Sequence, residues 1–139
     1  MRPLRSPPAL AAVLVLCTTS ALASPVGLWR AKDGAEIRIA ACGSALCGHV
    51  AKARIDPTTG RPVLNRHNPD PARRNRPLTG TAILIGMHAE GPGRWVGRLH
   101  HQDDGRLYDG RMIELGRAYI RIEGCSLGIC GGEEMTRIR

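Results

Sequence analysis

The histidines are the first residues whose chemistry could define a site, because imidazole is the commonest metal ligand and a frequent general base. Five are present, and two of them, His100 and His101, are adjacent. Neighbouring residues on a strand point to opposite faces, so this pair cannot chelate one metal ion together. Either could still meet His49, His67 or His88 across a sheet. The pattern favours surface or lining histidines, and no metal site is predicted.

Motifs for catalysis are incomplete. His88-Ala89-Glu90 matches the His-x-Glu of zinc deaminases, but the Pro-Cys-x-x-Cys that would complete the zinc site does not follow. Paired histidines at a helical spacing are absent as well. We therefore predict no catalytic residues, no cofactor and no enzymatic activity.

Asp70, Arg73 and Arg76 form the most suggestive polar group. On a short helical turn, a guanidinium three residues after a carboxylate can fork onto it. This spacing favours a structural brace, and the alternative is a clamp for an anionic group. We take these three residues as candidate ligand-binding residues. Trp95 and Tyr108 are two further candidates. Packing in the core is the favoured role for both, and lining the wall of a ligand pocket is the alternative.

The N-terminus indicates export. Two arginines precede an apolar run at residues 9–18, and Ala21-Leu22-Ala23 is the small-x-small pattern of signal-peptide cleavage. The run is shorter than the roughly 20 residues that a membrane-spanning helix needs. We therefore predict a cleaved signal peptide at 1–23, a single domain at 24–139, no stable membrane insertion and a periplasmic or secreted location.

The cysteines of the predicted domain are arranged as Cys42-x₄-Cys47 and Cys125-x₄-Cys130. An even set in an exported chain indicates disulfides, and a four-cysteine zinc site is the less favoured alternative. Each pair brackets a turn-like stretch, so local pairing is predicted. A disulfide between distant strands would stabilise the folded protein by about 4.5 kcal/mol, against about 2 kcal/mol for a local one. Pairing between distant strands therefore stays the alternative connectivity.

The composition combines a basic charge with few large side chains. Twenty Lys and Arg against twelve Asp and Glu give a formal net charge of +8, while the chain has two Trp, two Tyr and no Phe. A basic domain suggests nucleic acid, but predicted export argues against that partner. We expect a monomer whose thin core gains from the disulfides.

Alternating apolar and polar residues, clearest at 36–40 and 119–123, indicate half-buried strands separated by tight turns. Consecutive hairpins favour an up-and-down meander, and closure into a barrel removes its exposed edges. The sequence predicts an all-β barrel of about eight strands at 26–31, 35–42, 47–54, 79–88, 94–101, 106–115, 118–125 and 132–138.

One segment, residues 56–78, interrupts the strands with five Pro and five Arg. Within it, Asp70 is a suitable N-cap and Pro71 a suitable first residue for one helical turn at 72–75. Two interpretations stay open: an ordered crossover that lies across a barrel mouth, and a mobile surface loop.

Several motifs resemble the secreted bacterial family called domain of unknown function 2147. The crossover motif at 68–80 carries the resemblance, together with segments in the family's order: Gly27-Leu28-Trp29, residues 42–48, Trp95-x-Gly97, Asp104-Gly105-x-x-Tyr108 and residues 124–137. The resemblance implies a lipocalin-like barrel and no established activity. The chain departs from the family at 99–102, where Ile-Tyr-Asp-Pro is usual, and at Met135, where a Trp often stands.

These observations favour an exported binding module for a small lipophilic or anionic ligand or for an envelope partner. The alternatives are a structural or partner-binding envelope protein and an enzyme that acts on a small envelope substrate. An eight-stranded barrel is compatible with a binding module, since its interior either fills with side chains or holds one small ligand.

Overall fold

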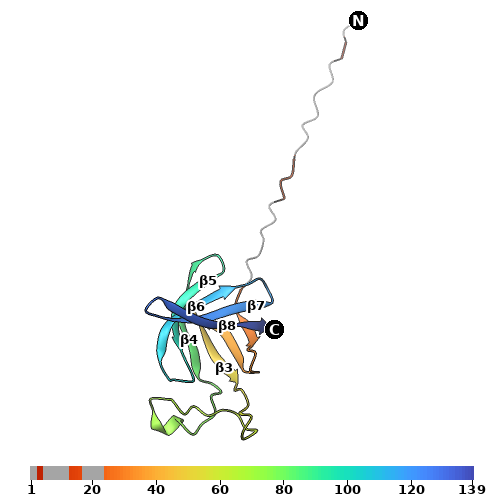
Figure 1. Ribbon diagram of the computed structural model, residues 1–139. Coiled ribbons are helices and arrows are strands. Elements are labelled where there is room, and N and C mark those ends of the chain that lie inside the picture. Colours follow the sequence, from red (N-terminus) through yellow and green to blue (C-terminus); the bar gives the residue numbers. More distant parts are fainter. Residues whose placement is uncertain (1–2, 5–12, 17–23) are drawn as a thin grey trace.

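The computed structural model describes residues 3–4, 13–16 and 24–139 (Figure 1). The predicted signal peptide falls almost wholly on the other residues, and its cleavage site after residue 23 lies outside the described ranges. Within the described part of the chain, no helix has the length and apolar character needed to cross a membrane.

Eight antiparallel strands form one closed barrel in which each strand pairs with its sequence neighbours and the last pairs with the first. This confirms the predicted all-β, up-and-down fold. The strands are β1 (Gly27–Arg30), β2 (Glu36–Cys42), β3 (Ala45–Lys52), β4 (Ala82–Gly91), β5 (Arg94–His100), β6 (Leu107–Glu114), β7 (Tyr119–Ser126) and β8 (Ile129–Arg137).

Three predicted strands have boundaries that are wrong by two or three residues, and in two cases the cysteines explain the difference. The predicted β3 at 47–54 is Ala45–Lys52, and the predicted β8 at 132–138 is Ile129–Arg137. Cys42 pairs with Ala45 and Cys125 with Cys130 inside the ladders, so each hairpin turn is only two residues long. The predicted β4 at 79–88 is Ala82–Gly91, since residues 79–81 belong to the crossover.

Both predicted disulfides are confirmed. Cys42–Cys47 closes the β2–β3 hairpin, and Cys125–Cys130 closes the β7–β8 hairpin. In the second hairpin, Leu127 (φ 51°) and the glycine after it both adopt a left-handed backbone, as a type I′ turn requires. Disulfides of this kind persist in oxidising environments outside the cytoplasm.

The segment between β3 and β4 projects from one end of the barrel (Figure 1). Its helical turn is a 3₁₀ helix at Pro71–Arg73, slightly earlier than predicted, and Ala72 N donates to its predicted N-cap, Asp70 Oδ1, at 3.0 Å. Asn65 is buried in the segment, where its backbone N–H donates to Arg76 O at 2.8 Å. The segment therefore carries internal structure, as the ordered-crossover interpretation expects.

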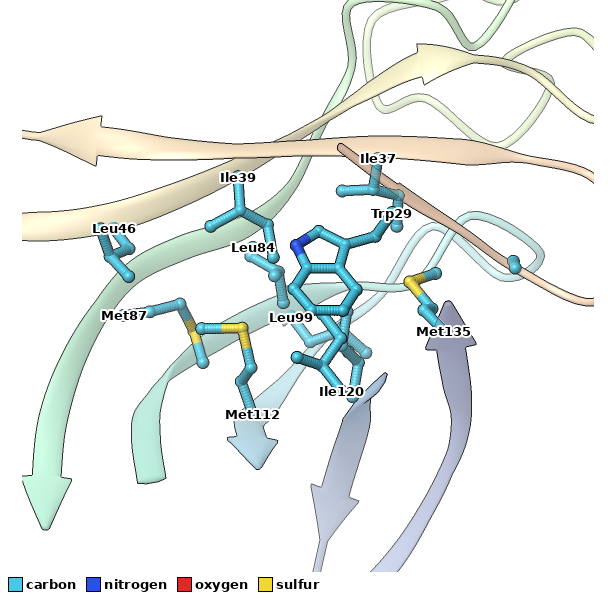
Figure 2. Close-up of a cluster of buried hydrophobic side chains, with 12 residues drawn as sticks. Trp29, Ile37, Ile39, Leu46, Leu84, Met87, Leu99, Met112, Ile120 and Met135 are labelled. Atoms are coloured by element: carbon cyan, nitrogen blue, oxygen red, sulfur yellow. The ribbon is translucent and has the colours of Figure 1, made fainter. Parts of the chain in front are cut away.

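The core fills the barrel end opposite the crossover. Trp29 is fully buried at its centre, with Met87 and Met112 on one side and Met135 on the other (Figure 2). The unbranched thioether of Met fits irregular spaces, which suits a core that has no Phe. The remaining buried members are small or aliphatic: Ala31, Ile37, Ile39, Leu46, Leu84, Leu99, Ile120 and Ile122.

Barrel closure depends on a short seam between β1 and β8. Only two register pairs join these strands, Trp29 with Arg137 and Arg30 with Thr136. The guanidinium of Arg137 lies 4.2 Å from the centre of the Trp29 ring. It also donates to the backbone carbonyls of Arg117, Val26 and Ser24 at 2.7, 2.9 and 2.6 Å. One side chain thus links the first strand, the last strand and the β6–β7 turn.

We expect Arg137→Met to destabilise the barrel by about 1.5–3 kcal/mol, because charge-assisted hydrogen bonds and a cation–π contact are lost while the apolar stem is kept. Arg38→Met, on the exposed outer face of β2, is the control and changes stability little. Denaturant unfolding measures both, and equal losses for the two variants would contradict this role of Arg137.

Replacing Cys125 and Cys130 together by Ser should lower the free energy of unfolding by about 2 kcal/mol, the loop-closure value for so short a disulfide loop. Peptide mapping of the non-reduced wild-type protein is the companion measurement. A peptide that links the 42–47 segment to the 125–130 segment would show that the local pairing is wrong.

Candidate functional site

A cavity of about 370 Å³ opens at the crossover end of the barrel. Ile37, Leu99, Ile122 and Met135 belong both to the core and to the cavity lining, so they form its floor. Val50, Leu78 and Ile83 extend the apolar wall toward the crossover. The cavity is therefore the unfilled half of the barrel interior.

Small residues leave this space open. The cavity lining includes Ala31, Ala35, Ala53, Gly124, Gly131 and Gly132. A Cβ at Gly124 would clash with the Leu99 side chain, and one at Gly132 would clash with the β7 backbone, so these two positions require glycine. Gly131 is different, because a Cβ built there would meet no other atom within 4 Å and its φ is not positive. A side chain at this position would project into open space.

The rim of the cavity is polar, with contributions from the β1–β2 turn, the crossover, the β5–β6 turn and β8. Arg54 stands between two carboxylates, with its Nε 3.8 Å from Asp33 Oδ2 and its Nη2 3.3 Å from Asp103 Oδ1. These contacts connect the crossover to the two turns. The other polar lining residues are His100, His101, Gln102 and Glu133.

Glu133 enters the cavity from β8. It lies two residues before the buried Met135 and pairs with Ile122, so strand alternation places it on the inner face. Burial raises the pKa of its carboxyl above the usual value, and the Asp33 carboxylate raises it further. Glu133 is thus an exposed acid at the cavity mouth, and its neighbouring carboxylates act against its ionisation.

The β5–β6 turn arranges the remaining rim. Gln102 Nε2 donates to His100 O at 3.1 Å, while Gln102 Oε1 is buried with no hydrogen-bond partner among the described residues. Asp104 accepts a hydrogen bond from the Tyr108 hydroxyl, which lowers the pKa of the aspartate and raises that of the tyrosine.

The predicted group Asp70, Arg73 and Arg76 lies on the crossover, away from the cavity lining. Arg73 Nε is 3.4 Å from Asp70 Oδ2, the predicted brace, and both side chains are largely exposed. Arg73 and Arg76 instead line a groove of about 540 Å³, together with His49 and Asn65. An anion clamp formed by Arg73 and Arg76 stays a prediction, and a bound anion would lie in this groove.

Trp95 and Tyr108 are both half-buried and pack against the core. Trp95 Nε1 donates to Glu114 Oε1 at 3.3 Å, and Trp95 also lines a groove with Arg94 and Arg111. Tyr108 packs edge-on to His101, with ring centroids 6.0 Å apart. The structure therefore does not bring the five predicted ligand-binding residues together.

Two arrangements suggest chemistry that their structural context does not support. Glu123, Cys125 and Cys130 lie within metal-ligating distance of one another, but both cysteines are in a disulfide. Gly124-Cys125-Ser126-Leu127-Gly128 has the Gly-x-Ser-x-Gly spacing of a nucleophile elbow, which needs a strand followed by a helix. Here a strand follows, since Ser126 ends β7 and β8 begins at Ile129.

We expect Glu133→Gln to raise the melting temperature at neutral pH. A carboxyl whose pKa is raised by folding contributes its full stability below the unfolded-state pKa and loses it as the pH rises through the folded-state pKa. The gain should therefore disappear in acid. Thermal melts across the pH range test this, with Glu134→Gln on the outer face as control. A variant that is less stable than wild type at neutral pH would show that the ionised Glu133 stabilises the fold.

Comparisons with known proteins agree with this architecture. A solved structure described as "Protein HP1028 from the human pathogen Helicobacter pylori belongs to the lipocalin family" has a similar fold, with a TM-score of 0.69 and 14% sequence identity over 84% of each chain. No curated protein matches the sequence. Residues 27–137 match a family described as "Uncharacterized protein conserved in bacteria (DUF2147)". The chain therefore belongs to this bacterial family, domain of unknown function 2147, and has a lipocalin-like fold.

Proposed function

We propose that the protein is an exported, monomeric binding module that holds a small lipophilic molecule in the open half of its barrel. The observation that carries this proposal is the cavity of about 370 Å³, floored by Ile37, Leu99, Ile122 and Met135. Binding sites for small molecules are typically concave and mostly apolar, with a few polar groups that fix orientation. The cavity has each of these properties.

The size of the cavity limits the ligand. Ligand pockets generally run from about 300 to about 1,000 Å³, so this one suits a molecule at the small end of that range. Trp29, Met87 and Met112 are fully buried in the opposite half of the barrel, so among the described residues that half is packed with side chains. A ligand would enter and leave at the crossover end.

Two features support binding rather than catalysis. The lipocalin-like barrel provides an interior for a ligand, and the cavity rim has no serine or cysteine nucleophile beside a base among the described residues. The disulfides support a periplasmic or secreted location. For the ligand itself, carboxylates at the rim favour a lipophilic molecule over the anionic one that Arg73 and Arg76 suggested.

A side chain that fills the cavity should abolish binding. Gly131→Phe places a ring in the open space inside the barrel without a clash at Cβ, so the protein should fold and lose affinity for octanol. Gly91→Phe is the matched control at the other end of the barrel, where Cβ also has free space. Isothermal titration with octanol, after thermal melts of both variants, provides the measurement. Undiminished octanol binding by Gly131→Phe would place the ligand elsewhere.

A further inference from the structure

We propose that the cavity selects a ligand whose polar end is an amine or another organic cation, with its apolar body on the barrel floor. This inference rests on the proposed function, and it assigns a chemical class to the ligand. The charges at the rim and the carboxylate there that lacks a donor both favour a cation.

Carboxylates outnumber cations at the rim. Asp33, Asp103 and Glu133 line the cavity, whereas Arg54 is the only Lys or Arg among the described lining residues. The two lining histidines, His100 and His101, do not reverse this balance when they are neutral. The chain as a whole has a formal net charge of +8, so the mouth is opposite in sign to the rest of the molecule. Such a local reversal attracts a cation and repels an anion.

Arg54 does not compensate Glu133. Its guanidinium is shared between Asp33 at 3.8 Å and Asp103 at 3.3 Å. Glu133 has no ion pair within the described part of the chain, and the Asp33 and Asp103 carboxylates both act against its ionisation. Lys32 and His101 act in the opposite direction, but neither makes a salt bridge to it. A ligand cation beside Glu133 would supply the missing positive charge.

Glu133 has no hydrogen-bond donor of its own at the rim, because Arg54 is occupied by Asp33 and Asp103. Gln102 Oε1 is buried without a partner, and Glu133 accepts no hydrogen bond from the described residues. An ammonium group offers three donors and no acceptor, whereas a carboxylate offers only acceptors. A cationic amine beside Glu133 therefore supplies both the positive charge and the donors that this carboxylate lacks. An inorganic cation would leave the apolar floor of Ile37, Leu99 and Met135 unused.

Octylamine, octanol and octanoate test the inference, because they share one chain and differ in the charge of the polar end. Calorimetric titration should give the order octylamine, octanol, octanoate, with octylamine about tenfold or more tighter than octanol, as for a charge-assisted hydrogen bond. The preference should shrink with added salt, since the mouth is partly exposed to solvent.

Two variants of β8 separate a local contact from a general charge effect. Glu133→Gln should reduce octylamine affinity about tenfold and octanol affinity by much less, because only the amine loses a charge-assisted contact. Glu134→Gln removes the same charge from the next residue, which faces outward, and should change neither affinity. Because Glu133→Gln is expected to be the more stable protein at neutral pH, a loss of binding would not reflect unfolding.

The outcomes distinguish this inference from the proposed function. Octanol binding with no preference for octylamine would leave the cavity as a binding site and overturn the amine specificity. Octanoate as the tightest ligand, or equal losses of octylamine binding in the Glu133 and Glu134 variants, would overturn it as well. Failure of both octanol and octylamine to bind would instead overturn the proposed function.

Discussion

The closure of the barrel at the β1–β8 seam is the contact on which the rest of the structure depends. Only two register pairs join the strands, and Arg137 adds three hydrogen bonds to backbone carbonyls while its guanidinium covers the Trp29 ring. Without this seam the meander would be an open, curved sheet with two exposed edges. With it, alternate residues of every strand face one enclosed interior.

The shortage of large side chains has two consequences in this interior. Trp29, Met87 and Met112 supply enough volume to fill one half, and the lining of the other half includes three alanines and Gly131, where a side chain would have free space. The thin core is therefore the origin of the cavity. An unfilled cavity lowers stability, because its lining residues lack packing partners. The two disulfides offset part of that cost by holding hairpins at opposite ends of the barrel.

The fold was accessible from the sequence because its signals are local: alternation marks the strands, and cysteine spacing marks two hairpins. The Asp70–Arg73 pair was accessible for the same reason, since both residues belong to one turn. The cavity rim was not, because Asp33, Arg54 and Glu133 are far apart in sequence and each resembles an ordinary surface charge. Only strand register and closure bring them together. One signal was available, since Glu133 lies two residues before the apolar Met135 and so shares its inner face.

We propose that a ligand occupies the mouth half of the barrel and not the filled half. The methionines provide internal reporters, because Met135 lines the cavity, whereas Met87 and Met112 lie in the packed half. Methyl NMR of protein labelled at its methionines, titrated with octanol, measures the position directly. We expect a progressive shift of the Met135 signal with little change at Met87 and Met112. A titration in which Met87 or Met112 shifts while Met135 does not would contradict it.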